Sequence, residues 1–384
     1  TMSEKIQNGW KWVKLGEVGI VITGKTPSSK HPKDWGYDMP FVTPTDFKNY
    51  RKFADDSERY LSSAGINKLK NKVLPEDSIL VTCIGYIGKV VMNKVPVVTN
   101  QQINSIIPNR NIVFPDFLYY VLVYNYETFK SFESNGTAVP ILNKTDFENI
   151  EVLIPPLPEQ KAIAEVLSSI DDKIDLLHRQ NKTLEEMAMT LFRQWFIEPT
   201  KDRLPEGWEI GKFEENLKNV YGKNLPTSKL KDSGYPVFGG NGKIGYYTEY
   251  MYEESQVLIS CRGEASGKVN ISDPKSYITN NSLILERAKN KNISFEYLKY
   301  YCLNYDFTQF VTGSAQPQIT IEELNNAEIL IPPSILINKF SKIISNFETK
   351  IFSNKIQIQT LEKLRDTLLP KLMSGEVRVK MDIM

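Results

Sequence analysis

Two short segments carry residue patterns that could bind a cofactor. Residues 19–26 read GIVITGKT, which satisfies the spacing of a phosphate-binding loop that holds a nucleotide with backbone amides and a lysine. Residues 238–242 read FGGNG, which satisfies the F-x-G-x-G spacing by which methyltransferases bind their methyl donor. Taken alone, these patterns would indicate a self-contained P-loop enzyme or a self-contained methyltransferase.

The surrounding residues favour a different interpretation of both patterns. Residues 20–23 (IVIT) are β-branched and predict a strand, without the additional glycine that a tight anion-binding turn needs. A related segment in the second half of the chain has Asn224 where a phosphate-binding loop requires Ser or Thr. The Asp/Asn-Pro-Pro-aromatic partner of the methyl-donor motif occurs nowhere in the sequence. We therefore interpret Lys25 and Lys223 as loop cations near phosphate, and residues 238–242 as a flexible loop or turn.

Other residues that could support catalysis or hold a metal are few. The chain has only two histidines, His31 and His178, and its three cysteines form no C-x-x-C pair. No arrangement of Ser, His and Asp has the signature of a catalytic triad. The sequence predicts no catalytic, cofactor-binding or metal-binding residues, and Cys83 and Cys261 are expected to be small buried residues of core strands.

The second half of the chain repeats the first. Residues 79–85 (ILVTCIG) correspond to residues 257–263 (VLISCRG), an offset of 178 residues. Residues 150–156 (IEVLIPP) correspond to residues 327–333 (AEILIPP), an offset of 177 residues. Each half is therefore predicted to form one globular unit followed by one tail.

The globular units are predicted to be mixed α+β domains. Short β-branched runs alternate with Gly, Pro and Asn, and an aromatic helix is expected at residues 115–124, with a counterpart at residues 295–303. The strands expected in the first unit are residues 18–23, 79–82, 95–99, 103–107 and 150–154.

The tail of each unit is predicted to be a long helix. No proline occurs between Pro158 and Pro199, and apolar residues follow steps of four and three, which is typical of a coiled-coil seam. Because neither helix can bury its stripe alone, we expect the two to form an antiparallel coiled coil that separates the domains. Asn181 and Asn354 would fix the register of that pair, or would mark a locally solvated gap. The predicted seam residues are Ile163, Leu167, Ile170, Ile174, Leu177, Asn181, Leu184, Leu191, Phe340, Ile344, Phe347, Ile351, Asn354, Ile358, Leu361 and Leu368.

The residues around the helix ends resemble those of a known family. Residues 154–161 (IPPLPEQK), 204–208 (LPEGW) and 369–376 (LPKLMSGE), with the echo at 331–333 (IPP), are similar to the specificity subunits of type I restriction-modification enzymes. The resemblance covers the whole chain. It implies residues 1–155 as target-recognition domain 1, 156–199 as long helix 1, 200–332 as target-recognition domain 2, 333–374 as long helix 2, and 375–384 as a C-terminal tail.

The resemblance also implies function and partners. The chain would be a sequence-specific DNA-binding subunit that reads a bipartite target in double-stranded DNA, with one half-site per domain. Its partners would be two DNA-adenine methyltransferase subunits and, for cleavage, the restriction subunits. S-adenosylmethionine, ATP and Mg would bind those partners and not this chain. A coiled-coil scaffold that binds protein and not DNA remains an alternative.

Composition constrains these expectations. The 47 basic and 46 acidic residues leave a formal net charge of +1, so a DNA-binding chain must gather its cations locally or rely on partners for part of the phosphate grip. The sequence has no apolar run of membrane-spanning length and no apolar segment near its start, so we expect a soluble intracellular protein. The family resemblance implies a complex in the cytoplasm.

The candidate DNA-reading residues are polar, basic or aromatic residues of predicted loops, which could reach base edges or phosphates. In the first domain they are Lys25, Thr26, Ser28, Ser29, Lys30, Thr45, Lys48, Asn49, Arg51, Tyr86, Gln101 and Gln102, and in the second domain they are Lys223, Asn224, Ser228, Asn241, Lys243, Arg262, Gln316 and Gln318.

Overall fold

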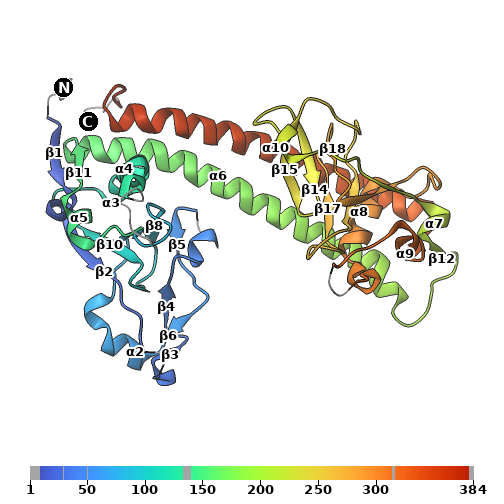
Figure 1. Cartoon of the computed structure of the whole chain (residues 1–384), viewed down its shortest axis with the longest axis horizontal. Helices are drawn as coiled ribbons and strands as arrows, with labels where there is room; N and C mark the ends of the chain where they lie inside the picture. The colour runs from blue at the N-terminus through green and yellow to red at the C-terminus, as the bar shows by residue number, and fades with distance from the viewer. Residues whose placement is uncertain (1–8, 29, 50, 133–139, 314–315, 380–384) are drawn as a thin grey trace. The chain divides into compact units, whose positions relative to one another are not determined.

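The chain forms two compact units. The computed structural model describes residues 9–28, 30–49, 51–132, 140–313 and 316–379. Unit 1 comprises residues 1–176 and 357–384, and unit 2 comprises residues 177–356 (Figure 1). Both division points fall inside long helices, so each unit contains one globular domain and part of each helix.

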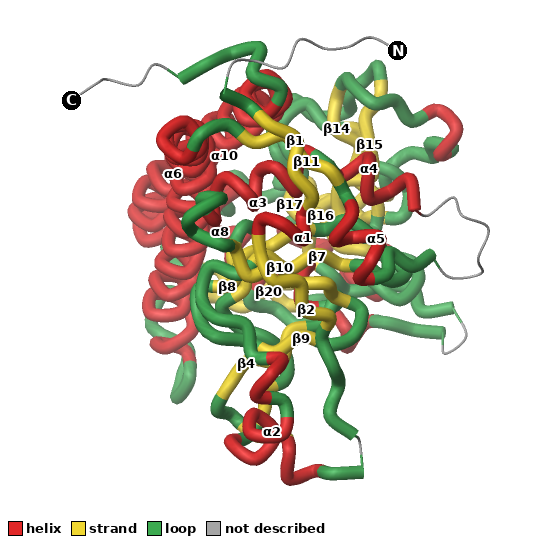
Figure 2. The backbone as a smooth tube through the Cα atoms, turned by 90° about the vertical axis from the view of Figure 1, so that its left-hand side faces the viewer, coloured by secondary structure: helices red, strands yellow, loops and turns green. Residues whose placement is uncertain are grey.

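Unit 1 is built around a five-stranded sheet with the order β2-β10-β7-β8-β5. All its neighbours are antiparallel except β5 and β8, which are parallel. A smaller sheet has the order β3-β6-β4-β9, and β1 pairs with β11 (Figure 2). The strands are β1 (Lys11–Lys14), β2 (Gly19–Thr23), β3 (Trp35–Gly36), β4 (Met39–Val42), β5 (Phe53–Ala54), β6 (Tyr60–Leu61), β7 (Ile79–Thr82), β8 (Val90–Asn93), β9 (Val98–Thr99), β10 (Ile103–Pro108) and β11 (Glu151–Ile154).

The helices of unit 1 cover this framework and complete its core. The aromatic helix α3 spans the predicted residues and buries Phe117, Leu118 and Tyr120. Strand β9 begins later than predicted, at Val98, because Pro96 lacks the amide that a ladder requires. The helices are α1 (Leu15–Val18), α2 (Ser63–Lys68), α3 (Pro115–Tyr124), α4 (Tyr126–Ser131) and α5 (Lys144–Asn149).

Unit 2 repeats this framework. Its four-stranded antiparallel sheet has the order β13-β19-β16-β17, which matches β2-β10-β7-β8 of unit 1. The pair β12–β20 matches β1–β11, and the parallel pair β14–β18 matches β4–β9. Its elements are β12 (Glu209–Lys212), α7 (Phe213–Asn216), β13 (Lys218–Tyr221), β14 (Tyr235–Gly239), β15 (Gly242–Tyr247), β16 (Val257–Ser260), β17 (Val269–Ile271), β18 (Tyr277–Ile278), β19 (Ser282–Glu286), α8 (Phe295–Leu303), α9 (Ile321–Asn325) and β20 (Glu328–Ile331).

Two long helices follow the two domains. Helix α6 spans Leu157–Phe192 and continues into a π-helical turn and a short 3-10 turn that ends at Thr200, and helix α10 spans Ser334–Met373. Helix α10 thus begins at Ser334, where SIL replaces the LPE that begins the first long helix. Among the residues that the structure describes, no helix is long and apolar enough to cross a membrane.

Within unit 1, the parts of α6 and α10 run antiparallel. Arg365 Nη1 lies 3.1 Å from Asp171 Oδ1, and Arg378 of the segment after α10 pairs with Glu159 at 2.7 Å, so residue numbers rise on one side as they fall on the other. The predicted seam residues of this unit are buried, except that Leu361 and Leu368 are half-buried.

The parts of the two helices in unit 2 also run antiparallel. Asn354 bonds to Asn181, and the Phe340 ring lies 5.9 Å from that of Phe192. Leu184, Leu191 and Phe347 are half-buried at the seam, and the other predicted seam residues of this unit are buried. The predicted fold class, two mixed domains with an antiparallel helix pair and an internal repeat, is confirmed.

Candidate nucleic-acid interface

The sheet of unit 1 brings several predicted loops to one edge. Thr23 ends β2 beside Asn104, and Thr82 ends β7 beside Ile103, so the loops that follow these strands leave the sheet together. Backbone hydrogen bonds tie the loops to one another: Lys25 N donates to Thr99 O at 2.9 Å. We call this edge the first rim; its loops are residues 24–28, 43–47, 83–89, 99–102 and 140–142.

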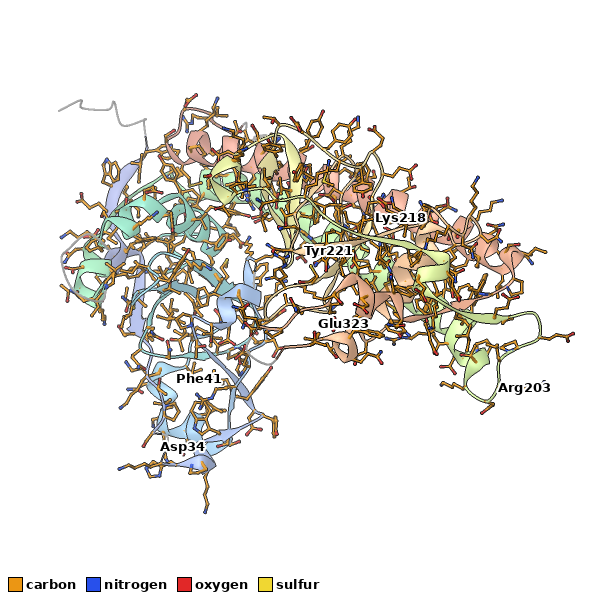
Figure 3. All side chains as sticks on the ribbon, turned by 45° about the vertical axis from the view of Figure 1, so that its right-hand side comes forward. Asp34, Phe41, Arg203, Lys218, Tyr221 and Glu323 are labelled. Atoms are coloured by element: carbon orange, nitrogen blue, oxygen red, sulfur yellow. The ribbon has the colours of Figure 1, made fainter. Side chains whose placement is uncertain are left out.

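The sheet of unit 2 builds an equivalent edge. Lys223 N donates to Ile278 O at 2.9 Å, and Cys261 N donates to Asn281 O at 3.0 Å, as Cys83 N does to Gln102 O in unit 1. Figure 3 labels Tyr221, the residue after which this edge begins. We call it the second rim; its loops are residues 222–226, 239–242, 261–268, 279–281 and 316–318.

The polar side chains of the first rim form local hydrogen bonds. The Thr26 hydroxyl donates to Gln101 Oε1 at 2.6 Å, which joins two of the predicted residues across 75 positions of sequence. The buried Asn100 side chain donates to Gln102 Oε1 at 2.9 Å. In the neighbouring loop, residues 43–47, the hydroxyls of Thr43 and Thr45 lie 2.7 Å apart. These bonds give the exposed loops defined positions before any ligand binds.

An exposed aromatic residue and a cation stand at the tip of the loop after β7. Tyr86 is 62% exposed, and Lys89 Nζ lies 5.0 Å from the centre of its ring. Gly85 and Gly88 turn this loop with φ values of +76° and +92°, which strain residues that carry a Cβ. Gly263 and Gly267 have φ values of +76° and +91°, so the loop of the second rim turns in the same way.

Several cations at the rims lack acidic partners. Among the residues that the structure describes, Lys25, Lys89, Lys223 and Arg262 form no ion pair, and all four are exposed. Some lysines in other parts of the domains are paired, as Lys68 is with Asp34 at 2.6 Å. An unpaired exposed cation keeps its full charge for an external anion, so both rims can bind phosphate.

Two cations were missed by the sequence reasoning. Thr82 N donates to Lys89 O at 3.0 Å, and Ser260 N donates to Lys268 O at 2.8 Å, so Lys89 and Lys268 occupy equivalent places where the rim loops rejoin the sheet. The second loop is one residue longer, which shifts the alignment. The Gly-Lys dipeptide that ends both loops was the available signal.

Some predicted residues of unit 1 lie away from the rim or outside the description. Arg51 pairs with Asp175 of α6 at 2.7 Å, and Lys48 pairs with Glu58 at 3.3 Å, so both charges are compensated within the fold. Lys30 lies just beyond the rim loop 24–28, in an exposed turn where its N donates to Ser28 Oγ at 3.3 Å. Asn49 ends a short 3-10 helix, and Ser29 lies outside the described residues.

The predicted residues of unit 2 are also spread unevenly. Asn224 is exposed next to Lys223, and Asn241 Oδ1 accepts a hydrogen bond from Lys268 at 2.6 Å, so both lie at the second rim. Gln316 and Gln318 are exposed on the loop that closes the same rim. Lys243 instead lies on β15, 3.0 Å from the Tyr246 hydroxyl, and Ser228 lies in a 3-10 turn.

Equivalent contacts attach each domain to a long helix. The Tyr120 hydroxyl of α3 donates to Asp171 Oδ2 at 2.6 Å, and the Tyr300 hydroxyl of α8 donates to Glu348 Oε1 at 2.9 Å. Burial raises the pKa of both tyrosines, so the hydroxyls stay protonated as donors. Arg365 pairs with Asp171, and Lys299 pairs with Glu348 at 2.5 Å. These contacts fix α3 and α8 against the long helices.

The two cofactor-like segments have structural roles. A Cβ at Gly24 would lie 2.2 Å from the carbonyl oxygen of Asn100, and one at Gly222 would lie 2.3 Å from that of Thr279. Both glycines are therefore required by close backbone contact within the rims. Residues 20–23 belong to β2, and residues 238–242 form the turn between β14 and β15, where Gly242 has a φ of +101°.

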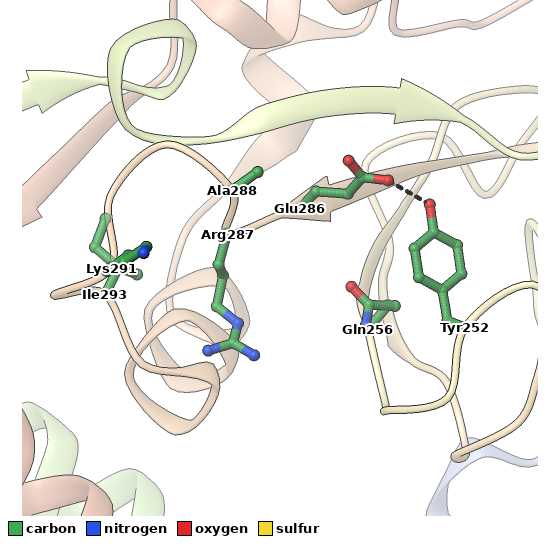
Figure 4. A pocket seen from close by; sticks show the side chains of 7 residues that line it. All are labelled: Tyr252, Gln256, Glu286, Arg287, Ala288, Lys291 and Ile293. Atoms are coloured by element: carbon green, nitrogen blue, oxygen red, sulfur yellow. Dashed lines mark hydrogen bonds between the residues drawn. The ribbon is translucent and has the colours of Figure 1, made fainter.

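A pocket of about 440 Å³ lies in unit 2 away from the rim. Glu286, at the end of β19 that lies farther from the rim loop 279–281, accepts a hydrogen bond from Tyr252 at 2.6 Å (Figure 4). Glu286 also pairs with Lys218 at 3.1 Å, so its charge is compensated. Within the described part of the chain, no group of three His, Cys, Asp or Glu residues could hold a metal ion.

Together these features define a tandem-repeat protein in which each repeat carries an exposed, partly basic rim of loops. Residues 7–186 and 205–363 match the family described as the type I restriction modification DNA specificity domain. The chain is 30% identical to the type I restriction enzyme MjaIX specificity subunit of Methanocaldococcus jannaschii, with 98% of this chain and 95% of that protein covered. The chain therefore belongs to the family of type I restriction-modification specificity subunits.

Further relatives agree. The type I restriction enzyme EcoprrI specificity subunit of Escherichia coli is 22% identical over 90% of each chain. The crystal structure of a type I restriction-modification S subunit from M. genitalium shares the fold with a TM-score of 0.63 at 17% identity, covering 99% of this chain and 98% of that one.

Proposed function

We propose that this chain reads DNA as the non-catalytic subunit of a type I restriction-modification enzyme, and that each rim reads one part of a two-part target. The observation that carries the proposal is the pair of equivalent rims in a chain of the specificity-subunit family. Sequence-specific proteins present polar and basic side chains on loops held by a rigid framework, and both rims have this construction.

The charges of the rims support this function. The net charge of +1 gives the whole chain little attraction for DNA, so the exposed cations without acidic partners are the groups that can bind phosphate. Lys25 and Lys89 supply them in unit 1, and Lys223 and Lys268 do so in unit 2. Such a small number of phosphate contacts is consistent with a subunit whose partner subunits also bind the DNA backbone.

The partners in this proposal are two methyltransferase subunits and, for cleavage, restriction subunits. An exposed apolar pair on α10 supports docking of a methyltransferase subunit: Phe352 and Ile356 lie one helical turn apart and are about half exposed. S-adenosylmethionine, ATP and Mg would bind the partners, since both cofactor-like segments of this chain serve its own strands and turns. The complex would act in the cytoplasm, on the DNA of the cell.

Two other functions predict different results. A self-contained methyltransferase or P-loop enzyme would bind S-adenosylmethionine or ATP as the purified chain, which calorimetry would detect. A coiled-coil scaffold without a DNA role would leave no footprint on DNA when it is assembled with the methyltransferase subunits.

The decisive experiment is sequencing of methylated adenines in a host that expresses this chain with its methyltransferase subunit. We expect one methylated motif with two specific parts and an unread gap. The matched control expresses the methyltransferase subunit without this chain and should show no such motif. Absence of any motif, or a continuous motif without a gap, would contradict the proposal.

A further inference from the structure

The two rims share one backbone arrangement that carries opposite side chains. In unit 1, Ile84 and Ile141 form an isolated antiparallel bridge, and in unit 2 the equivalent bridge joins Arg262 and Gln318. The flanking hydrogen bonds are the same: Leu142 N donates to Cys83 O at 2.8 Å, and Ile319 N donates to Cys261 O at 3.1 Å. The backbone is thus preserved while the chemistry of the paired side chains changes.

Three of these four side chains are exposed, whereas Ile84 is half-buried and packs partly against the core of unit 1. Ile141 is 51% exposed, next to the exposed Tyr86 loop. Arg262 and Gln318 are also exposed, and among the described residues the Arg262 guanidinium has no ion-pair partner. Burial therefore does not account for Ile141, and ion pairing does not account for Arg262, which leaves an external surface as the group that these side chains contact.

The chemistry of the two pairs matches different base edges. Arginine donates two hydrogen bonds to the O6 and N7 atoms of guanine, glutamine can pair with adenine, and apolar side chains contact the methyl group of thymine. Glu264, two residues after Arg262, is exposed and would repel phosphate, so it favours a base edge over the DNA backbone as the partner of Arg262. Lys89 and Lys268, at the ends of the same loops, can hold the adjacent phosphates.

We propose that these equivalent pairs are specificity-determining residues: Ile84 and Ile141 contact a thymine methyl group in one part of the target, and Arg262, with Gln318 beside it, reads a guanine in the other part. This assignment rests on the proposed function, since it names the bases that each rim contacts. The assignment also goes beyond the proposed function. It states that one backbone position, present in both units, contacts guanine in one unit and thymine in the other because its two side chains differ.

Base analogues test the assignment in the complete complex with the methyltransferase subunits. Each guanine of the target is replaced in turn by 7-deazaguanine, which lacks the N7 acceptor, and each thymine by uracil, which lacks the methyl group. We expect one guanine analogue to weaken binding about tenfold. We expect one thymine analogue, in the other half of the target, to weaken binding about fourfold.

The variants then connect each base to its pair. With Arg262→Ala, the sensitive guanine analogue should no longer matter, and with Ile84→Ala combined with Ile141→Ala the sensitive uracil should no longer matter. Arg203→Ala, at another exposed arginine of unit 2 (labelled in Figure 3), is the matched control and should keep the full sensitivity to both analogues. Because the analogues act on the unaltered protein, they remain informative if a variant folds poorly.

The outcomes separate this inference from the proposed function. A normal two-part target whose analogue sensitivities are unchanged by these variants would overturn the assignment and leave the proposed function intact. Loss of sensitivity at bases in both halves from the Arg262 variant would also overturn it. A complex without any two-part target would instead overturn the proposed function.

Discussion

Asn354 Nδ2 donates a hydrogen bond of 2.8 Å to Asn181 Oδ1 inside the helix pair of unit 2. Asn354 is 0% exposed and Asn181 is 8% exposed, so this polar pair is buried and a locally solvated gap is disfavoured. The repeat offset of 177 residues places Leu177 at the position of Asn354, and Ile358 at that of Asn181. The paired amides are therefore not repeated by the internal symmetry, as expected of a contact that selects one register.

The first prediction concerns this pair. Asn354→Leu leaves the buried Asn181 amide facing an apolar side chain, so the free energy of unfolding should fall by about 1–3 kcal/mol. Chemical denaturation measures the change. The double variant Asn181→Leu with Asn354→Leu removes both amides and should recover or exceed the original stability. A single variant that is more stable than the unaltered protein would show that the Asn181 amide is satisfied by water.

The second prediction concerns Arg262. Arg262→Ala should weaken binding of the cognate duplex by about 1–3 kcal/mol, because a two-bond contact to guanine is lost. Binding of scrambled DNA should barely change. Titration of the complex with both duplexes measures the difference, and Arg203→Ala should leave both affinities unchanged. An equal loss on cognate and scrambled DNA would make Arg262 a phosphate contact.

The third prediction concerns the equivalent lysines that end the rim loops. Lys89→Ala and Lys268→Ala should weaken cognate and scrambled DNA alike, because phosphate contacts carry no base information. Binding weakens as salt concentration rises. Each variant should make this fall of log K with log salt concentration shallower by about 1, as loss of one phosphate contact does. Lys11→Ala, at an exposed lysine of β1, is the control and should keep the slope. An unchanged slope for both rim variants would place these lysines outside the interface.

The fourth prediction concerns the hydroxyls that attach each domain to a helix. Tyr120→Phe and Tyr300→Phe each remove one buried hydrogen bond to a carboxylate, so each should reduce the free energy of unfolding by about 1–2 kcal/mol. Thermal or chemical unfolding checks the loss. Tyr37→Phe, at a residue that is 94% exposed, should change nothing. Stabilities equal to that of the unaltered protein would mean that water replaces these contacts without loss.

The fifth prediction concerns pH and the buried thiols. Burial raises the pKa of Cys83 from 9.0 to about 12 and the pKa of Cys261 to about 11. Since the folded-state pKa values lie above those of the unfolded chain, the stabilisation from these neutral thiols is complete below about pH 9. It is lost as the pH rises toward 11 to 12.

Thiol labelling provides the measurement. At pH 8 the folded protein should react slowly with a thiol reagent, because Cys83, Cys261 and Cys302 are all buried. The same protein in denaturant is the control, and all three of its cysteines should react with the reagent. Fast labelling of the folded chain would contradict the burial of these residues.

Much of the architecture follows from local patterns. The aromatic helices α3 and α8 span the predicted residues, and β7 does as well, because periodicity and β-branched runs are properties of neighbouring residues. The repeat supplied independent support for each element of the second unit. The helix seam was also readable, since steps of four and three residues place apolar side chains on one face without any information from the rest of the fold.

The partners of individual side chains depended on tertiary structure. Arg51 was expected at a DNA-reading loop, but in the structure it pairs with Asp175, 124 positions away in sequence. Lys89 and Lys268 were not predicted from the sequence. The backbone hydrogen bonds of β7 and β16 show that they occupy equivalent positions. A linear pattern records which residues are polar and which face of an element they share. Whether a charge is paired within the fold or remains available to a ligand depends on contacts between distant segments, which are established only when the sheets and helices pack.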